Sequence, residues 1–284
     1  MSKIYDYIII GSGFGGSVSA MRLAEKGYSV LVIEKGKNYK ANDFPKSDYR
    51  IRKYFWAPII KCFGIFKMTF FKKVVVLSGV GVGGGSLVYA NTHVVPPDEF
   101  FNNKSWSSFK NWKKVLMPFY DQARFMLGTT KNKSFNRADE VLKEVAADMG
   151  KEDSFDTVDV GVYFGDHEKE VDPYFNGLGP VRTGCQECAG CLIGCPHNAK
   201  NSLDKNYLYF AKQFGVEVIA ERKVEKLEYS NGEYTVFTHS SMSWFKNKKK
   251  VYKSKGIVVS GGVLGSLKFL LKQNSQLVSS YFYH

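Results

Sequence analysis

The chain has 284 residues, of which 44% are hydrophobic, so it is long and apolar enough for one large domain or two smaller ones. Its net charge of +13 comes with no nucleic-acid recognition motif, and we expect no nucleic-acid partner. The dense lysine run Lys246–Lys250 fits a solvated hairpin tip. No segment has the pattern of a signal peptide or membrane span, which favours a cytoplasmic location.

The N-terminal residues predict a βαβ unit. Residues 5–10 form an apolar run that stops at a glycine, as in a buried parallel strand. Residues 15–26 carry apolar side chains at helical spacing, and Gly27 is a natural helix stop. Residues 28–33 form a second apolar strand, which Glu34 follows.

The loop of this unit has the spacing of a dinucleotide-binding fingerprint. Gly11 permits a tight turn, Gly13 lets the backbone approach a pyrophosphate, and Gly16 lets the helix pack close to the strand. The helix N-terminus offers free N–H groups to phosphates, and Glu34 can accept hydrogen bonds from ribose hydroxyls while disfavouring a 2′-phosphate. The loop with its flanking residues supplies the first predicted cofactor contacts: Gly11, Ser12, Gly13, Phe14, Gly15, Gly16, Glu34 and Lys35. By themselves they do not distinguish FAD from NAD.

A second glycine-rich loop runs from Ser78 to Thr92. Such a run costs conformational entropy, so close passage of backbone along a flat ligand is its expected use. The preceding segment, residues 41–77, is rich in apolar residues but is interrupted by Pro58 and by lysines. It is interpreted either as partly buried loop and strand, or as a lid on an apolar substrate or on a membrane surface.

The rest of the chain alternates between helix and strand patterns. Helices are predicted over 112–127, 138–149 and 199–214. Strands are predicted over 216–220, 223–239 and 251–259, the last running into Ser260-Gly261-Gly262. The resulting fold class is α/β.

At this order and spacing the motifs resemble the glucose–methanol–choline (GMC) oxidoreductase family, in particular its cholesterol-oxidase-like branch. The segments Trp112–Gly128, Gly194–Leu208 and Ser260–Ser266 are also similar to that family. The resemblance implies a doubly wound, Rossmann-like FAD-binding sheet with the start of a smaller α+β substrate region. The FAD-binding domain would comprise residues 1–93 and 196–284, with a substrate-side region over 94–195.

The resemblance also implies further FAD contacts. The second loop would pass beside the flavin, the backbone of Val224 would lie near the adenine, and the late turn would approach the cofactor. Many members have Asn where this chain has Tyr89, and Asn91 is the alternative contact. The contacts implied in this way are Gly79, Gly83, Gly84, Gly85, Ser86, Tyr89, Asn91, Val224, Gly261 and Gly262.

The activity implied by the resemblance is FAD-dependent oxidation of a sterol or other hydrophobic alcohol to a ketone or aldehyde, with O2 or a protein as electron acceptor. The family's active-site histidine lies beyond the end of this chain, so no catalytic residue is assigned. His93 is the nearest substitute, although a satisfied polar residue is the simpler interpretation. We expect a C-terminally truncated enzyme. The alternative is a non-catalytic FAD-binding remnant, or a flavin and iron–sulfur subunit that needs a second chain.

Four of the five cysteines lie within eleven residues, as Cys185, Cys188, Cys191 and Cys195. This is the spacing of a ferredoxin-type iron–sulfur run, whereas a zinc site usually has two separated pairs. Cys195 or Cys62 could supply a fourth ligand. A reduced, cysteine-rich turn without metal is the open alternative.

Overall fold

The computed structural model describes residues 3–44, 51–243 and 248–273. The chain forms two compact units. Unit 1 consists of residues 1–89, 190–196 and 202–284, and unit 2 of residues 90–189 and 197–201.

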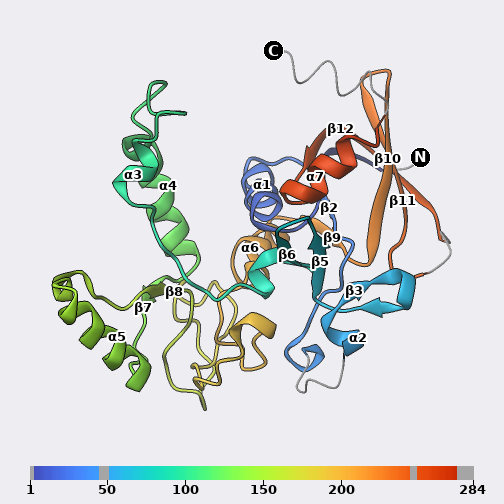
Figure 1. The fold of residues 1–284 in the computed structure, drawn as a ribbon. Helices are drawn as coiled ribbons and strands as arrows, with labels where there is room; N and C mark the ends of the chain where they lie inside the picture. The colour runs from blue at the N-terminus through green and yellow to red at the C-terminus, as the bar shows by residue number, and fades with distance from the viewer. Residues whose placement is uncertain (1–2, 45–50, 244–247, 274–284) are drawn as a thin grey trace. The chain divides into compact units, whose positions relative to one another are not determined.

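Unit 1 contains a six-stranded sheet in the order β10-β11-β12-β1-β2-β9 (Figure 1). Strands β12, β1, β2 and β9 run parallel, while β10, β11 and β12 pair antiparallel. This mixed sheet confirms the predicted α/β class with a Rossmann-like core. The strands are β1 (Ile4–Ile10), β2 (Val30–Ile33), β9 (Glu217–Ile219), β10 (Arg222–Ser230), β11 (Glu233–Ser240) and β12 (Lys250–Val259).

The second half of β1 and the whole of β2 are buried on both faces, which explains their apolar sequences there. All four residues of β2 are buried, and so are the consecutive residues Ile8 and Ile9 of β1. Helix α1 (Phe14–Glu25) contacts β1 and β2, and helix α6 (Tyr207–Gln213) packs beside α1. Phe269 of helix α7 (Val263–Leu270) packs against the core cluster of the sheet.

The segment between β2 and the second glycine loop contains short elements outside the main sheet. Helix α2 (Ile51–Tyr54) precedes an antiparallel pair of β3 (Trp56–Ala57) and β4 (Cys62–Phe63). The antiparallel hairpin of β5 (Phe66–Phe70) and β6 (Val75–Gly79) follows and leads directly into the glycine loop. The chain also has 3₁₀ turns at Ala41–Asp43, Pro58–Ile60, Gly84–Leu87, Glu152–Ser154, Gly190–Ile193 and Leu203–Lys205.

Unit 2 combines helices with long irregular segments. Its helices are α3 (Asp98–Phe101), α4 (Trp112–Met126) and α5 (Arg137–Asp148), and its short strands β7 (Thr130–Lys131) and β8 (Asp159–Val160) pair antiparallel. Within unit 2, the buried side chain of Arg182 donates hydrogen bonds to the backbone oxygens of Asn198 and Lys200. This buried guanidinium therefore fixes the segment 197–201.

Two predicted elements differ from the structure. The strand expected over 223–239 is the antiparallel hairpin of β10 and β11, because the chain turns at Asn231 and Gly232, both of which have positive φ. The helix expected over 199–214 is replaced by a 3₁₀ turn and the shorter α6, because Asn206 has a non-helical backbone (φ −143°, ψ −97°) and caps α6 by accepting from the Tyr207 N–H at 2.7 Å. Only part of the run Lys246–Lys250 can be compared: Lys246 lies outside the described residues, whereas Lys250 begins β12.

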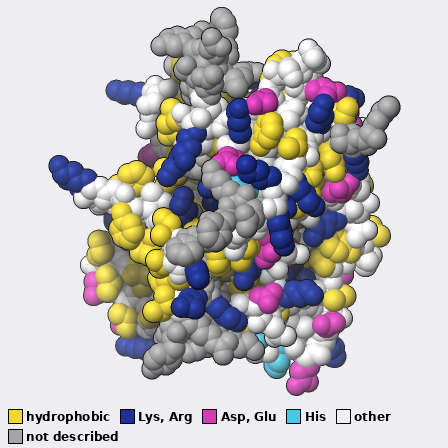
Figure 2. Space-filling model, turned by 90° about the vertical axis from the view of Figure 1, so that its right-hand side faces the viewer, with side chains coloured by type: hydrophobic (Ala, Val, Ile, Leu, Met, Phe, Trp, Pro, Cys, Tyr) yellow, Lys and Arg dark blue, Asp and Glu magenta, His cyan; other side chains and the backbone are white. Residues whose placement is uncertain are grey.

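The surface of the molecule mixes charges of both signs. Figure 2 shows Lys and Arg side chains scattered across one face, with acidic and apolar side chains between them. In the described part of the chain, no helix combines the length and the apolar character needed to span a bilayer.

Candidate dinucleotide-binding site

The first glycine turn is shaped by contacts that admit no side chain. Gly11 has φ +102°, in the left-handed region, and a Cβ added there would lie 2.6 Å from the backbone oxygen of Ser260. A Cβ on Gly16 would overlap the backbone oxygen of Gly11. The turn therefore packs α1 tightly against the end of β1. Since no side chain caps the N-terminus of α1, its first N–H groups are open to an anion.

Glu34 lies at the end of β2 and is bound to this turn. Its side chain is buried, and its Oε2 accepts hydrogen bonds from the Ser12 N–H at 3.1 Å and the Ser12 hydroxyl at 2.8 Å. Its Oε1 accepts from the Gly36 N–H at 2.8 Å. A carboxylate offers about four acceptor positions, so one remains for a ribose hydroxyl.

The second glycine loop packs onto the first. Gly84 has φ +54°, and a Cβ there would lie 2.7 Å from the Cα of Gly13. The Gly83 N–H donates to the Ser12 hydroxyl at 3.1 Å. Farther along, the buried Ser86 hydroxyl donates to the Gly83 oxygen at 2.7 Å and accepts from the Leu203 N–H at 3.0 Å. Two segments far apart in sequence thus form one backbone-lined surface.

The turn after β12 closes the same surface from the other side. The Ser260 N–H donates to the Ile10 oxygen at 2.9 Å, and the Ser260 hydroxyl donates to the Gly11 oxygen at 3.0 Å. A Cβ on Gly11 would lie 3.2 Å from the Cα of Gly261. Gly262 follows with φ +74° at the N-cap of α7.

The structure thus brings most of the predicted contacts together in unit 1. The residues that converge are Gly11, Ser12, Gly13, Gly16, Glu34, Gly79, Gly83, Gly84, Gly85 and Gly261. Phe14 meets Tyr89 edge-on, with ring centroids 6.0 Å apart. Lys35 lies one residue beyond Glu34, and burial lowers the pKa of its amine.

Two predicted contacts lie apart from this group. Val224 is buried in the core cluster, on β10. Asn91 belongs to unit 2, where it is 6% exposed and has φ +53°. Its backbone oxygen accepts from the Gly161 N–H at 2.8 Å, but its buried Oδ1 has no hydrogen-bond partner in the described structure. The contacts of Val224 and Asn91 with a cofactor stay predictions.

Sequence reasoning missed several residues that shape the site. Ser260 was recognised in its motif but not as a residue that holds the glycine turn. Gly36 was not identified: its N–H binds Glu34, and a Cβ there would overlap the backbone nitrogen of Gly81. The sequence feature that could have identified Gly36 is its position two residues after Glu34, the acid that follows β2.

His93 is a hydrogen-bonded polar residue of unit 2. Its Nδ1 lies 2.8 Å from the Thr129 hydroxyl, and its backbone N–H donates to the backbone oxygen of Asp159 at 2.8 Å. Burial lowers the pKa of its imidazole. These contacts agree with a satisfied polar residue, and no catalytic role is assigned to it.

The cysteine run gains no geometric support. Cys185 and Cys188 belong to unit 2, whereas Cys191 and Cys195 belong to unit 1. Within the described ranges, no group of three or more His, Cys, Asp or Glu side chains is arranged to hold a metal ion. The iron–sulfur cluster stays a prediction.

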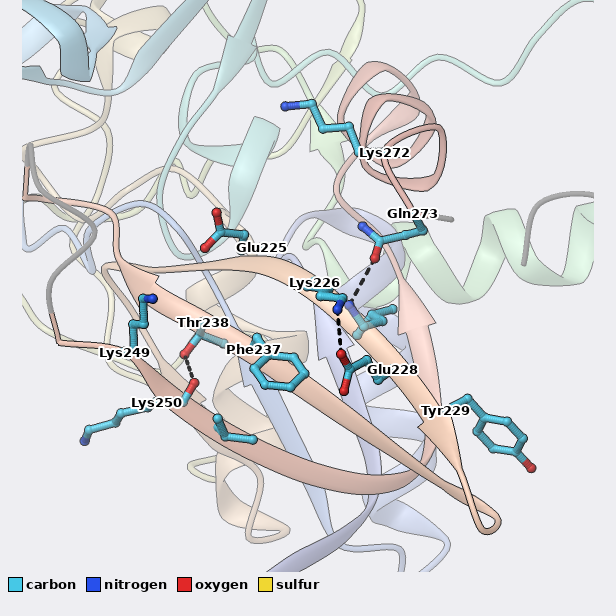
Figure 3. A pocket seen from close by; sticks show the side chains of 12 residues that line it. Glu225, Lys226, Glu228, Tyr229, Phe237, Thr238, Lys249, Lys250, Lys272 and Gln273 are labelled. Atoms are coloured by element: carbon cyan, nitrogen blue, oxygen red, sulfur yellow. Dashed lines mark hydrogen bonds and ion pairs between the residues drawn. The ribbon is translucent and has the colours of Figure 1, made fainter. Parts of the chain in front are cut away.

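A hollow of about 960 Å³ lies elsewhere in unit 1, on strands β10–β12 (Figure 3). Lys226, Lys249, Lys250 and Lys272 line it together with Glu225 and Glu228, and Lys226 pairs with Glu228 at 2.6 Å. None of the predicted cofactor contacts lines this hollow.

The sheet, the glycine turn at the start of α1 and the acid at the end of β2 define a dinucleotide-binding protein of the Rossmann-like class. Residues 9–39 match the model of the NAD(P)-binding Rossmann-like domain, and residues 181–275 match that of GMC oxidoreductases. Over the residues that it spans, the chain resembles the GMC oxidoreductase family.

Its relatives include two cholesterol oxidases, which are from Acinetobacter baumannii and Mycobacterium tuberculosis. Each is 44% identical to this chain, over 96% and 97% of it. The match takes in 51% and 49% of those proteins, so the chain spans about half the length of the curated relatives it matches. An FAD-dependent oxidoreductase from Chaetomium thermophilum shares the fold, with a TM-score of 0.60 at 15% identity, covering 94% of this chain and 47% of that one.

The family implies FAD, and the residues present fit it. The uncapped start of α1 suits a pyrophosphate, Glu34 keeps one acceptor position for a ribose hydroxyl, and the glycine surface leaves room for a flat ligand. FAD is therefore the cofactor that the family and the local geometry agree on.

Proposed function

We propose that this chain binds FAD through unit 1 and supplies the FAD-binding part of an alcohol-oxidising flavoprotein. The observation that carries the proposal is the convergence of three glycine segments at the start of α1. They are joined by hydrogen bonds from Ser12 to Glu34, from Gly83 to Ser12, and from Ser260 to Gly11. Each contact fixes backbone where a side chain would block the ligand.

The roles of the chain's own residues follow from these positions. The first turn of α1 binds the pyrophosphate, Glu34 orients the ribose, and the second glycine loop passes beside the flavin. Bound FAD would accept a hydride from the carbon that carries the alcohol group. None of the described residues is assigned to removal of the alcohol proton.

A sterol or another hydrophobic alcohol is the proposed substrate. The support is the name of the relatives at 44% identity, which are cholesterol oxidases, and of more distant relatives at 25% identity, such as an Arabidopsis thaliana long-chain-alcohol oxidase. O2 or a protein would take the electrons from the reduced cofactor.

The test is a spectrum of the purified chain incubated with FAD. We expect bound flavin after gel filtration, and bleaching of its absorbance when cholesterol or a long-chain alcohol is added without oxygen. Bound flavin that does not bleach would support the non-catalytic alternative. A folded chain that retains no flavin would contradict the proposal.

The iron–sulfur alternative has a separate test. Iron and acid-labile sulfide would be measured after anaerobic purification, with Cys188→Ala as the control. A cluster requires both elements in the wild-type chain and their loss in the variant. Their absence from the wild type would remove the subunit alternative and leave FAD binding untouched.

A further inference from the structure

The β5–β6 hairpin of unit 1 has an apolar face that is exposed in the part of the chain that the structure describes. Met68 pairs with Leu77 and Phe70 with Val75 across the hairpin. Because directly opposed residues of antiparallel strands point to the same face, and alternate residues share it, all four side chains lie together. They are 37%, 59%, 70% and 51% exposed, in that order.

The apolar character continues into the turn. Phe71 and Val74 are 51% and 58% exposed, and the Phe71 N–H donates to the Val74 oxygen at 2.9 Å. The base of the hairpin is anchored in unit 1, where the Val80 N–H donates to the backbone oxygen of the buried Ile65 at 2.8 Å. A two-stranded ribbon is marginal in water unless its apolar face is covered, and a contiguous exposed apolar patch marks an interaction surface.

The greater length of the relatives suggests an occupant for this face. The chain aligns with the N-terminal part of the Acinetobacter baumannii protein, of which it spans 51%. In that relative the matched sequence is accompanied by nearly as much polypeptide again. We propose that the β5–β6 face is the docking surface for a polypeptide equivalent to this second half.

Charge and geometry argue for this occupant. A second copy of the chain would bring exposed Lys72 and Lys73 against their own like charges, in a molecule of net charge +13. A bilayer would contact mainly the hairpin tip, whereas the apolar face extends to Leu77, which directly precedes the second glycine loop. A protein layer covers a whole sheet face. The docked polypeptide would therefore lie beside the loop assigned to the flavin.

The test is co-expression of this chain, carrying an affinity tag, with the unmatched second half of the Acinetobacter baumannii protein. We expect the two to co-purify as a one-to-one complex. In that complex, amide exchange over residues 66–79 should be slowed at least about tenfold, as burial of an interface requires. The inference rests on the resemblance to these longer relatives and not on flavin binding, so it can fail independently of the proposed function.

A matched pair of variants makes the test specific. Val75→Asp places a charge on the apolar face, while Val251→Asp places one on β12 at a valine with the same 51% exposure. Val75→Asp should weaken the complex about tenfold or more, corresponding to about 1.4 kcal/mol, and Val251→Asp should leave it unchanged. Absence of co-purification, equal effects of the two variants, self-association abolished by Val75→Asp, or binding of the chain only to phosphatidylcholine–phosphatidylserine vesicles would each overturn the proposal.

Discussion

The hydroxyl of Ser12 joins three parts of unit 1: it donates to Glu34 at 2.8 Å while accepting from the Gly83 N–H at 3.1 Å. Ser12 is fully buried. The residue proposed for the ribose and the loop proposed for the flavin are therefore held by one side chain of the pyrophosphate turn.

Ser12→Ala should loosen all of these contacts at once. It removes the hydroxyl that donates to Glu34 and leaves the buried Gly83 N–H without its acceptor, so we expect a loss of about 1–3 kcal/mol in the free energy of unfolding. Urea denaturation measures it. Ser254→Ala is the matched control, because Ser254 is equally buried and its hydroxyl donates to the nearby Gly256 oxygen within the same strand. Equal losses in the two variants would contradict the bridging role.

Two adjacent glycines of α1 should respond in opposite ways. Gly16→Ala drives a methyl group into the backbone of Gly11 and should cost about 2 kcal/mol or more in stability. Gly15→Ala meets only the Ser260 Cβ at 3.8 Å and should leave stability unchanged or raise it by up to about 1 kcal/mol. Thermal and urea unfolding of both variants would check this. A destabilised Gly15→Ala would contradict the described packing.

The pH dependence of stability should include a contribution from Asp6. The Lys255 ammonium and the Ser29 hydroxyl and N–H, which bind its carboxylate, hold the pKa of Asp6 well below its usual range. A lowered folded-state pKa gives stability that is present above the unfolded-state pKa of about 3.9 and lost as the pH falls toward the folded-state value.

The measurement is the urea midpoint between pH 6 and pH 2. Asp6→Asn should be less stable than the wild type at pH 6, and the difference should shrink as the pH falls below about 4. Asp153→Asn, at an exposed position of unit 2, is the control. A difference that stays constant with pH would show that ionisation of Asp6 is not responsible.

Asn91 provides a test inside unit 2. Its left-handed backbone suits glycine, so Asn91→Ala should be less stable than Asn91→Gly by about 1–2 kcal/mol. Because its buried Oδ1 has no described hydrogen-bond partner, Asn91→Gly itself should change stability by less than about 1 kcal/mol. The measurement is the free energy of unfolding of both variants in urea. A large loss of stability in Asn91→Gly would contradict the description of Oδ1 as a group without a hydrogen-bond partner.

Local sequence patterns predicted the strands of the sheet better than the helix that precedes β9. The apolar runs Tyr7–Ile10 of β1 and Val30–Ile33 of β2, each followed by a glycine or an acid, identified the βαβ unit because burial on both faces leaves few other sequences. The break at Asn206 could not be predicted, because the helical pattern continues through it and only the backbone angles show the cap.

Part of the site was also predictable from local sequence patterns. Glycine spacing reveals where backbone must approach backbone, as at Gly11 and Gly16. It does not reveal that Gly36 meets Gly81, or that Ser260 holds the turn, because these contacts join segments far apart in the chain. Hydrogen bonds of that kind depend on the tertiary fold and leave little trace in sequence spacing.

The central claim is that the glycine surface of unit 1 binds FAD, and titration of the purified chain with FAD, followed by flavin fluorescence, tests it most directly. We expect one FAD per chain, and binding weakened about tenfold or more by Gly84→Val, which would place a side chain against the Cα of Gly13. A folded wild-type chain that binds no FAD, or equal binding by Gly84→Val, would contradict the account.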